Sequence, residues 1–256
     1  SRNSMRRMCM VVLCMVTMFI VSSVWGHMLL INASDYTPKV GESVTIEIAW
    51  GHKFPKDEII KEERLAHVWA VDPEGQTSNL KEVSSGIYEL RIRQNGSYLV
   101  YAQTKPGVFT RTTDGFKRQN KEGLDNALFC INHEMGAKAI INADGEGNFP
   151  KADNDFVEII PQVNPIELKV GDTLPVKIFQ KGKPLFRDFI HATYAGFSDE
   201  GETFAFSTMV NREGMAKVKL LEAGQWLIKV PHKEPFPDQE KCDELFNCMT
   251  LTFEVK

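Results

Sequence analysis

The chain has 256 residues, with 30 basic and 34 acidic side chains and a formal net charge of −4. This balance argues against a nucleic-acid-binding protein, in which basic residues dominate one face. It is weakly compatible with the attraction of small cations. The length allows one large domain or two small ones.

Residues 1–26 have the pattern of a signal peptide. Arg6 and Arg7 precede an uncharged, apolar run from Met8 to Val21, and small or branched residues follow up to Gly26. We expect cleavage after Gly26; the alternative is an uncleaved anchor, since the run is nearly long enough to span a bilayer. Cleavage leaves 27 basic and 34 acidic residues, a net charge of −7. The mature chain is then expected to be exported and to contain no membrane span.

Three cysteines remain after the leader: Cys130, Cys242 and Cys248. An odd number in an exported protein implies at most one internal disulfide and one spare thiol. Cys242 with Cys248 is the local candidate, and Cys130 with either of them is also possible. The sequence does not choose between these pairings, because a disulfide requires Cα atoms within about 7 Å.

The first half of the mature chain alternates apolar and polar residues with the period of β-strands. Residues 43–50 and 65–71 are predicted strands, and the second runs into an Asp-Pro-Glu-Gly turn. Residues 86–103 are predicted to form a hairpin around Asn95-Gly96. Further strands are expected within 137–147 and 155–161. The best helical candidates are short, at 57–64 and 125–135, and a long irregular excursion is expected over about 106–135.

Residues 161–165, "PQVNP", are the predicted linker, after which the strand pattern restarts. Six or seven short strands in about ninety residues are typical of an immunoglobulin-like β-sandwich. We therefore predict an all-β protein with a signal peptide at 1–26 and two such sandwiches, an N-terminal one at 27–161 and a C-terminal one at 162–256.

Metal ligation is the chemistry that the histidines favour. Six histidines are present, without an HExxH motif or a pair of CxxC motifs, so any site must join distant segments. His52 extends the row of Val44, Ile46, Ile48 and Trp50 by one step, and His232 extends the row of Trp226, Ile228 and Val230 in the same way. Each is expected at a strand end, where sandwiches place binding loops. The alternative for either is a rim histidine hydrogen-bonded to a carbonyl.

His27 becomes the strongest candidate if it begins the mature chain. Its α-amine and imidazole Nδ1 could then chelate one cation, and an α-amine loses its proton at lower pH than a lysine does. Such a nitrogen-rich site suits Cu(II), Ni(II) or Co(II) better than Ca²⁺ or Mg²⁺. His67 is expected to be an ordinary sheet histidine and His191 to pack in the core, and His133 lies in the excursion as a mobile ligand or as no ligand.

Several stretches resemble a known family. They include "HMLLIN", "PKVGESVTIEIAWGHKFP", "TKPGVFTRTTDG", "ATYAGFS" and "GQWLIKVPHK". Together they are similar to the periplasmic NikM-like family, whose members carry a domain of unknown function associated with nickel and cobalt uptake. The resemblance covers residues 27–256 and implies a periplasmic β-sandwich protein that binds nickel or cobalt, with copper possible, as an accessory to membrane metal-transport components. The positions that carry over are His27, His52 and His232.

Two other functions compete with this one. Copper monooxygenases acting on polysaccharides also bind their metal through an N-terminal histidine and a second histidine, but they present it on a flat face with exposed aromatics. The sequence predicts no aromatic cluster around His27, so we expect no enzyme activity. The other alternative is a metal-free β-sandwich interaction module.

Overall fold

The computed structural model describes residues 26–145, 147–150 and 156–256, so the predicted signal peptide lies outside the described residues apart from Gly26. The described chain is all-β, as predicted, and its strands form three sheets. In chain order the strands are β1 (Met28–Ala33), β2 (Ser43–Gly51), β3 (Glu58–Ile59), β4 (Leu65–Val71), β5 (Thr77–Asn79), β6 (Lys81–Ser84), β7 (Ile87–Arg91), β8 (Gly96–Thr104), β9 (Gly107–Thr112), β10 (Gly115–Lys117), β11 (Ala127–Ala143), β12 (Val157–Pro161), β13 (Thr173–Gln180), β14 (Lys183–Pro184), β15 (Phe189–Tyr194), β16 (Phe206–Met209), β17 (Met215–Lys219), β18 (Gly224–Pro235) and β19 (Glu244–Val255). Two 3₁₀ turns, η1 (Glu62–Arg64) and η2 (Pro165–Glu167), complete the elements.

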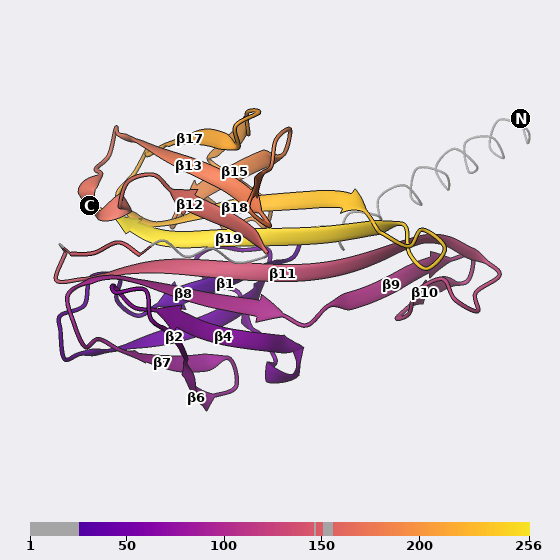
Figure 1. Ribbon diagram of the computed structural model, residues 1–256, viewed down its shortest axis with the longest axis horizontal. Helices are drawn as coiled ribbons and strands as arrows, with labels where there is room; N and C mark the ends of the chain where they lie inside the picture. Colours follow the sequence, from indigo (N-terminus) through magenta and orange to yellow (C-terminus); the bar gives the residue numbers. More distant parts are fainter. Residues whose placement is uncertain (1–25, 146, 151–155) are drawn as a thin grey trace, which may run out of the picture.

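The largest sheet lies between the two smaller ones (Figure 1). Its strands run in the order β16-β15-β18-β19-β11-β8-β4-β5, and β9 and β10 extend it beside β11. The parallel pairing of β11 with β19 joins the two halves of the chain in this sheet. The first small sheet has the order β1-β2-β7-β6 with β3 beside β2, and the second contains β12, β13, β14 and β17.

Two cores use opposite faces of the central sheet. On β11, Ala139 and Ile141 belong to the first core, against the β1 sheet, whereas Ile140 belongs to the second. This follows from the alternation of side chains along a strand. The predicted division after residue 161 follows the cores only in part, because Val71, Leu99, Tyr101 and Ile140 precede it and lie in the second core.

The hairpin predicted at Asn95-Gly96 is wrong. β7 pairs with β2 and β6, whereas β8 pairs with β4 and β11, so the chain crosses from the small sheet to the central sheet between them. Leu90 and Val100 consequently belong to facing sheets and both lie in the first core. Apolar and polar residues alternate with the same period in two paired strands and in two strands of facing sheets. The sequence pattern alone therefore does not distinguish a hairpin from this crossing between sheets.

The region predicted as irregular, 106–135, is mostly strand. It contains β9, β10 and the start of β11, which together extend beyond the small sheets (Figure 1). The helix predicted at 125–135 is therefore strand, and the one at 57–64 is β3 followed by η1. The β pairing of these segments is non-local, so their own helical propensity was a poor guide.

The disulfide joins Cys130 of β11 to Cys242, with 4.9 Å between the Cα atoms. Of the open pairings this is one of the two long-range ones, and Cys248 is free and buried in the first core. The backbone N–H of Asp243 donates to the carbonyl of Cys130, so the β18–β19 connection lies directly on β11.

Candidate functional site

The first two strands bring two of the predicted histidines together. Met28 pairs with Gly51, so His27 and His52 are the next residues beyond the β1–β2 ladder. Their ring centroids are 4.0 Å apart, and the His27 ring also stacks on Trp50 at 5.3 Å with 14° between the planes. Both histidines are half-buried. His52 directly follows the end of β2, and His27 directly precedes β1.

Hydroxyl groups of β19 hold the start of β1. The side chains of Thr250 and Thr252 donate to the carbonyls of Leu29 and Ile31 at 2.6 and 2.8 Å, and both threonines are buried. These bonds satisfy carbonyls on the edge of β1 that does not pair with β2. The strand that presents His27 is thereby tied to the central sheet.

A buried lysine and a carboxylate lie beside the pair. The ammonium of Lys229, 3 % exposed, donates to the carbonyl of Gly26 at 3.1 Å and to both carboxylate oxygens of Glu202 at 3.1 and 3.2 Å. The same carboxylate lies 3.6 Å from Nδ1 of His52. Glu202 therefore lies between His52 and the ammonium of Lys229, which also donates to the carbonyl of Gly26.

Gly26 fills the space between these groups. A Cβ at this position would stand 2.6 Å from Nδ1 of His52 and 3.2 Å from the carboxyl carbon of Glu202, so a larger residue would displace one of them. The space next to Nδ1 of His52 is therefore occupied by the last residue of the predicted leader.

A second carboxylate shapes the turn after β2. The side chain of Asp57 accepts from the backbone N–H groups of His52, Lys53 and Glu58 at 2.6 to 2.9 Å. Burial opposes its ionisation, but these bonds and the nearby His52 outweigh burial and lower the pKa of Asp57. Gly51 is required there, since a Cβ would lie 2.1 Å from that carboxylate.

Burial keeps His27 uncharged. Burial, then the proximity of His52 and of Arg64, lowers its pKa below the usual 6.5, against the opposite effect of Asp57 and Glu202. The guanidinium of Arg64 lies over the Trp50 ring, 4.0 Å from its centroid. His27 is thus neutral at pH 7, the form in which imidazole ligates a metal.

The structure does not bring His232 to this pair. Its Nδ1 lies 3.0 Å from Asp188 and its Nε2 lies 3.9 Å from Glu234. Along β18, Lys229 points toward Glu202 and Gly26, and His232, three residues later, lies on the opposite face with Val230, which belongs to the second core. The predicted convergence of three histidines fails for this reason, and a metal-ligating role for His232 remains a prediction.

The other histidines have distinct surroundings. His67 is exposed on β4 and stacks on Trp69 at 4.6 Å, as an ordinary sheet histidine does. His191 is half-buried rather than part of the core; its Nδ1 is 2.7 Å from Oγ of Ser207 and its ring stacks on Phe204.

His133 is the histidine that sequence reasoning valued too little. It lies on β11 between Ile131 and Met135, which belong to the first core, and therefore faces the side on which β1 and β2 pack. Burial, then the charges of Arg64 and His27, lowers its pKa. The signal that could have found it was the alternation of Cys130–Met135, which the expectation of an irregular segment obscured.

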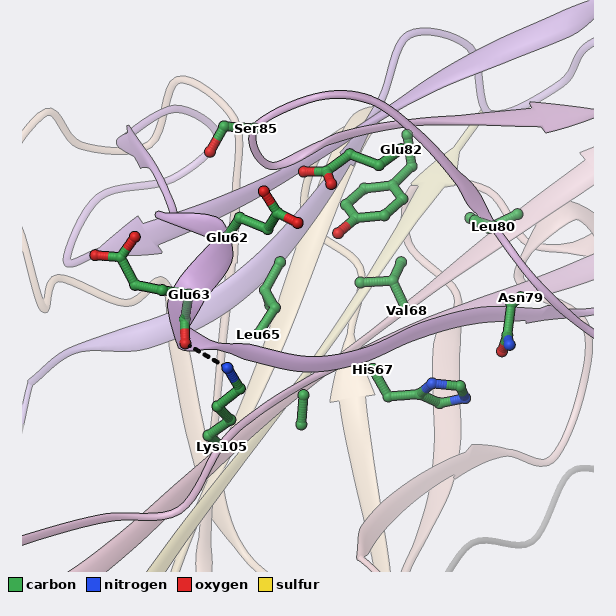
Figure 2. Close-up of a pocket in the computed structure, with 12 residues that line it drawn as sticks. Glu62, Glu63, Leu65, His67, Val68, Asn79, Leu80, Glu82, Ser85 and Lys105 are labelled. Carbon is green, nitrogen blue, oxygen red and sulfur yellow. Dashed lines mark hydrogen bonds between the residues drawn. The ribbon is translucent and has the colours of Figure 1, made fainter.

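A separate hollow of about 650 Å³ lies on the other side of η1. Figure 2 shows the carboxylates of Glu62 and Glu82 lying near one another in it, with the ammonium of Lys105 bonded to the carbonyl of Glu63. The hydrogen bond and repulsion between Glu62 and Glu82 raise the pKa of Glu62. This polar hollow is distinct from the histidine pair.

The described side chains form no ready-made group of three or more histidine, cysteine or carboxylate ligands around one point. In the described part of the chain, no helix has the length and apolar character needed to cross a membrane. What the structure offers is a pair of neighbouring imidazoles with carboxylates next to it.

Comparison with known proteins gives a family without an assigned activity. The model of a family described as "Domain of unknown function (DUF4198)" matches residues 24–234. No curated protein matches. Among solved structures, the D0-D1 domain of intimin is 13 % identical, with 89 % of this chain and 97 % of that chain covered and a TM-score of 0.24. The FN1-FN3 domains of chicken CNTN1 are 12 % identical, with 90 % and 68 % covered and a TM-score of 0.25.

Proposed function

We propose that this protein, which belongs to the DUF4198 family, is an exported binder of a divalent transition metal, with His27 and His52 as its ligands. Nickel or cobalt is the expected metal and copper the next candidate, and the protein would serve membrane metal-transport components in the periplasm. The observation that carries the proposal is the 4.0 Å separation of the His27 and His52 rings at the end of paired strands.

The donor set fits this class of metal. Two imidazoles favour nickel, cobalt or copper over magnesium or calcium, which prefer oxygen ligands. The lowered pKa of His27 means that a metal need not displace a proton from this ring near pH 7. Glu202, next to His52, supplies the negative charge that offsets the approaching cation.

Removal of the leader would complete the donors. With Gly26 gone, the α-amine of His27 is free and the space against Nδ1 of His52 is vacated. Lys229 loses its carbonyl partner but keeps Glu202. An amine and two imidazoles at this strand end constitute the nitrogen-rich site expected from the sequence.

Calorimetric titration with Ni²⁺ and Cu²⁺ tests the proposal. The samples are protein whose first residue is His27, the same protein with Gly26 retained, His52→Ala, and the control His67→Ala, an exposed histidine outside the site. We expect His52→Ala and retained Gly26 each to weaken binding by more than about 10-fold, since even outer-shell changes at metal sites cost that much. Equal affinity in all four samples would refute the proposal.

One observation favours a copper-dependent oxidative enzyme as the second candidate. No aromatic cluster was expected around His27, and one aromatic side chain, Trp50, stacks on its ring. Oxidation of a polysaccharide by copper-loaded protein and peroxide would support the enzyme. Absence of bindable metal would instead favour the interaction module.

A further inference from the structure

We infer that His133 is a third ligand of the metal bound at His27 and His52. The inference rests on the proposed function and replaces His232 by a histidine from the central sheet. Three properties of His133 carry it: its direction, its unpartnered nitrogen and its position on β11 near the start of β1.

The direction follows from the packing of the first core. Ile131 and Met135, two residues to either side of His133 on β11, lie in the core between the β1 sheet and the central sheet. Leu29 on β1 and Ile48 on β2 line the same core, and His27 continues the row of Leu29. His27 and His133 therefore continue rows of the first core on β1 and β11, and His52, which follows β2, lies beside His27.

The His133 ring packs closely against Gly107, and one of its nitrogen atoms has no hydrogen-bond partner. Gly107 pairs with His133, and a Cβ on this glycine would lie 2.5 Å from Nε2 of the ring, so only glycine leaves room for it. Nδ1 of the same ring is buried and has no hydrogen-bond partner. A buried polar atom without a partner costs about 1–3 kcal/mol, and a bound cation would remove that cost.

The hydrogen bonds of β19 bring the start of β1 to the same part of β11. Thr250 pairs with Ala137 of β11 and donates to the carbonyl of Leu29, so Leu29, two residues after His27, lies near the stretch of β11 that follows His133. The three side chains are not a ready-made metal group, so ligation by all three requires side-chain rotation. Loss of Gly26 gives His52 that freedom, because the glycine packs on its Nδ1.

The test uses protein expressed with its own leader and purified after processing, with His27 verified as the first residue. Ni²⁺ affinity and the Cu²⁺ EPR spectrum are measured for wild type, His133→Ala, Gly107→Ala, His52→Ala and the control His67→Ala. Gly107→Ala keeps the imidazole of His133 but displaces its ring, because the added Cβ would lie 2.5 Å from Nε2. Thermal unfolding of each variant verifies that it is folded.

We expect His133→Ala and Gly107→Ala to raise the Ni²⁺ dissociation constant by about 10-fold or more and to change the nitrogen hyperfine pattern of the copper spectrum, with His67→Ala unchanged. If His52→Ala abolishes binding while His133→Ala and Gly107→Ala bind as wild type does, the inference fails and the proposed function stands. If wild type binds no metal, both fail.

Discussion

The buried ion pair between Lys138 and Glu158 offers a test of how the second small sheet is held on the central sheet. Lys138 of β11 and Glu158 of β12 lie 2.5 Å apart and are 3 % and 0 % exposed. The ammonium also donates to the carbonyl of Ile159 at 3.0 Å, and the hydroxyl of Tyr101 donates to the carboxylate at 3.2 Å. Neither charge has access to water.

Lys138→Met leaves the Glu158 carboxylate buried without its cation, which costs about 3–5 kcal/mol. The double variant Lys138→Met/Glu158→Met removes both charges and fills the space with apolar atoms. We therefore expect its free energy of unfolding to lie within about 1 kcal/mol of the wild-type value or above it. Urea unfolding followed by tryptophan fluorescence at pH 7 measures both. A loss below about 1 kcal/mol in the single variant would show that water reaches the pair and would refute the reasoning.

Three further predictions concern the disulfide, the pH dependence and the anchoring of β1. Replacing Cys130 and Cys242 by serine opens a connection across 112 residues and should lower the unfolding free energy by up to about 4.7 kcal/mol in chemical denaturation; unchanged stability would contradict this. The pKa of His133 is lower in the folded chain than in the unfolded chain, so its contribution to the free energy of unfolding is complete above pH about 6.5 and is lost as pH falls through the folded value. His133→Asn should therefore flatten the decline in the free energy of unfolding between pH 7.5 and 5. An unchanged slope of stability against pH would argue against this prediction. Thr250→Val leaves the Leu29 carbonyl without its hydroxyl donor and should cost about 1–3 kcal/mol in urea unfolding, whereas no loss would mean that the bond is replaced.

Local pattern was sufficient for much of the fold. The strands predicted at 43–50 and 65–71 from alternation are present as β2 and β4, because alternate residues along most of each strand lie in the first core. Pairing partners were not predictable in this way. The chain around Asn95-Gly96 has the signals of a hairpin, yet β7 and β8 lie in facing sheets, and the parallel pairing of β11 with β19 joins segments more than a hundred residues apart.

The same limit applies to the site. Alternation placed His52 at the end of a core-facing row, and the β1–β2 register then brought His27 beside it. It also placed His232 at the end of such a row, but that row faces the second core. Which of two cores a row faces depends on the sheet order, and the order is a long-range property. His133 was expected in an irregular segment, but the non-local pairing of β11 makes that segment a strand.

Anomalous diffraction at the nickel edge, from crystals of processed protein soaked in Ni²⁺, tests the central claim most directly. We predict one strong peak about 2.1 Å from a ring nitrogen of both His27 and His52, the usual distance for a metal–imidazole bond. A strong peak at His232 alone, or no protein-bound nickel, would contradict the account.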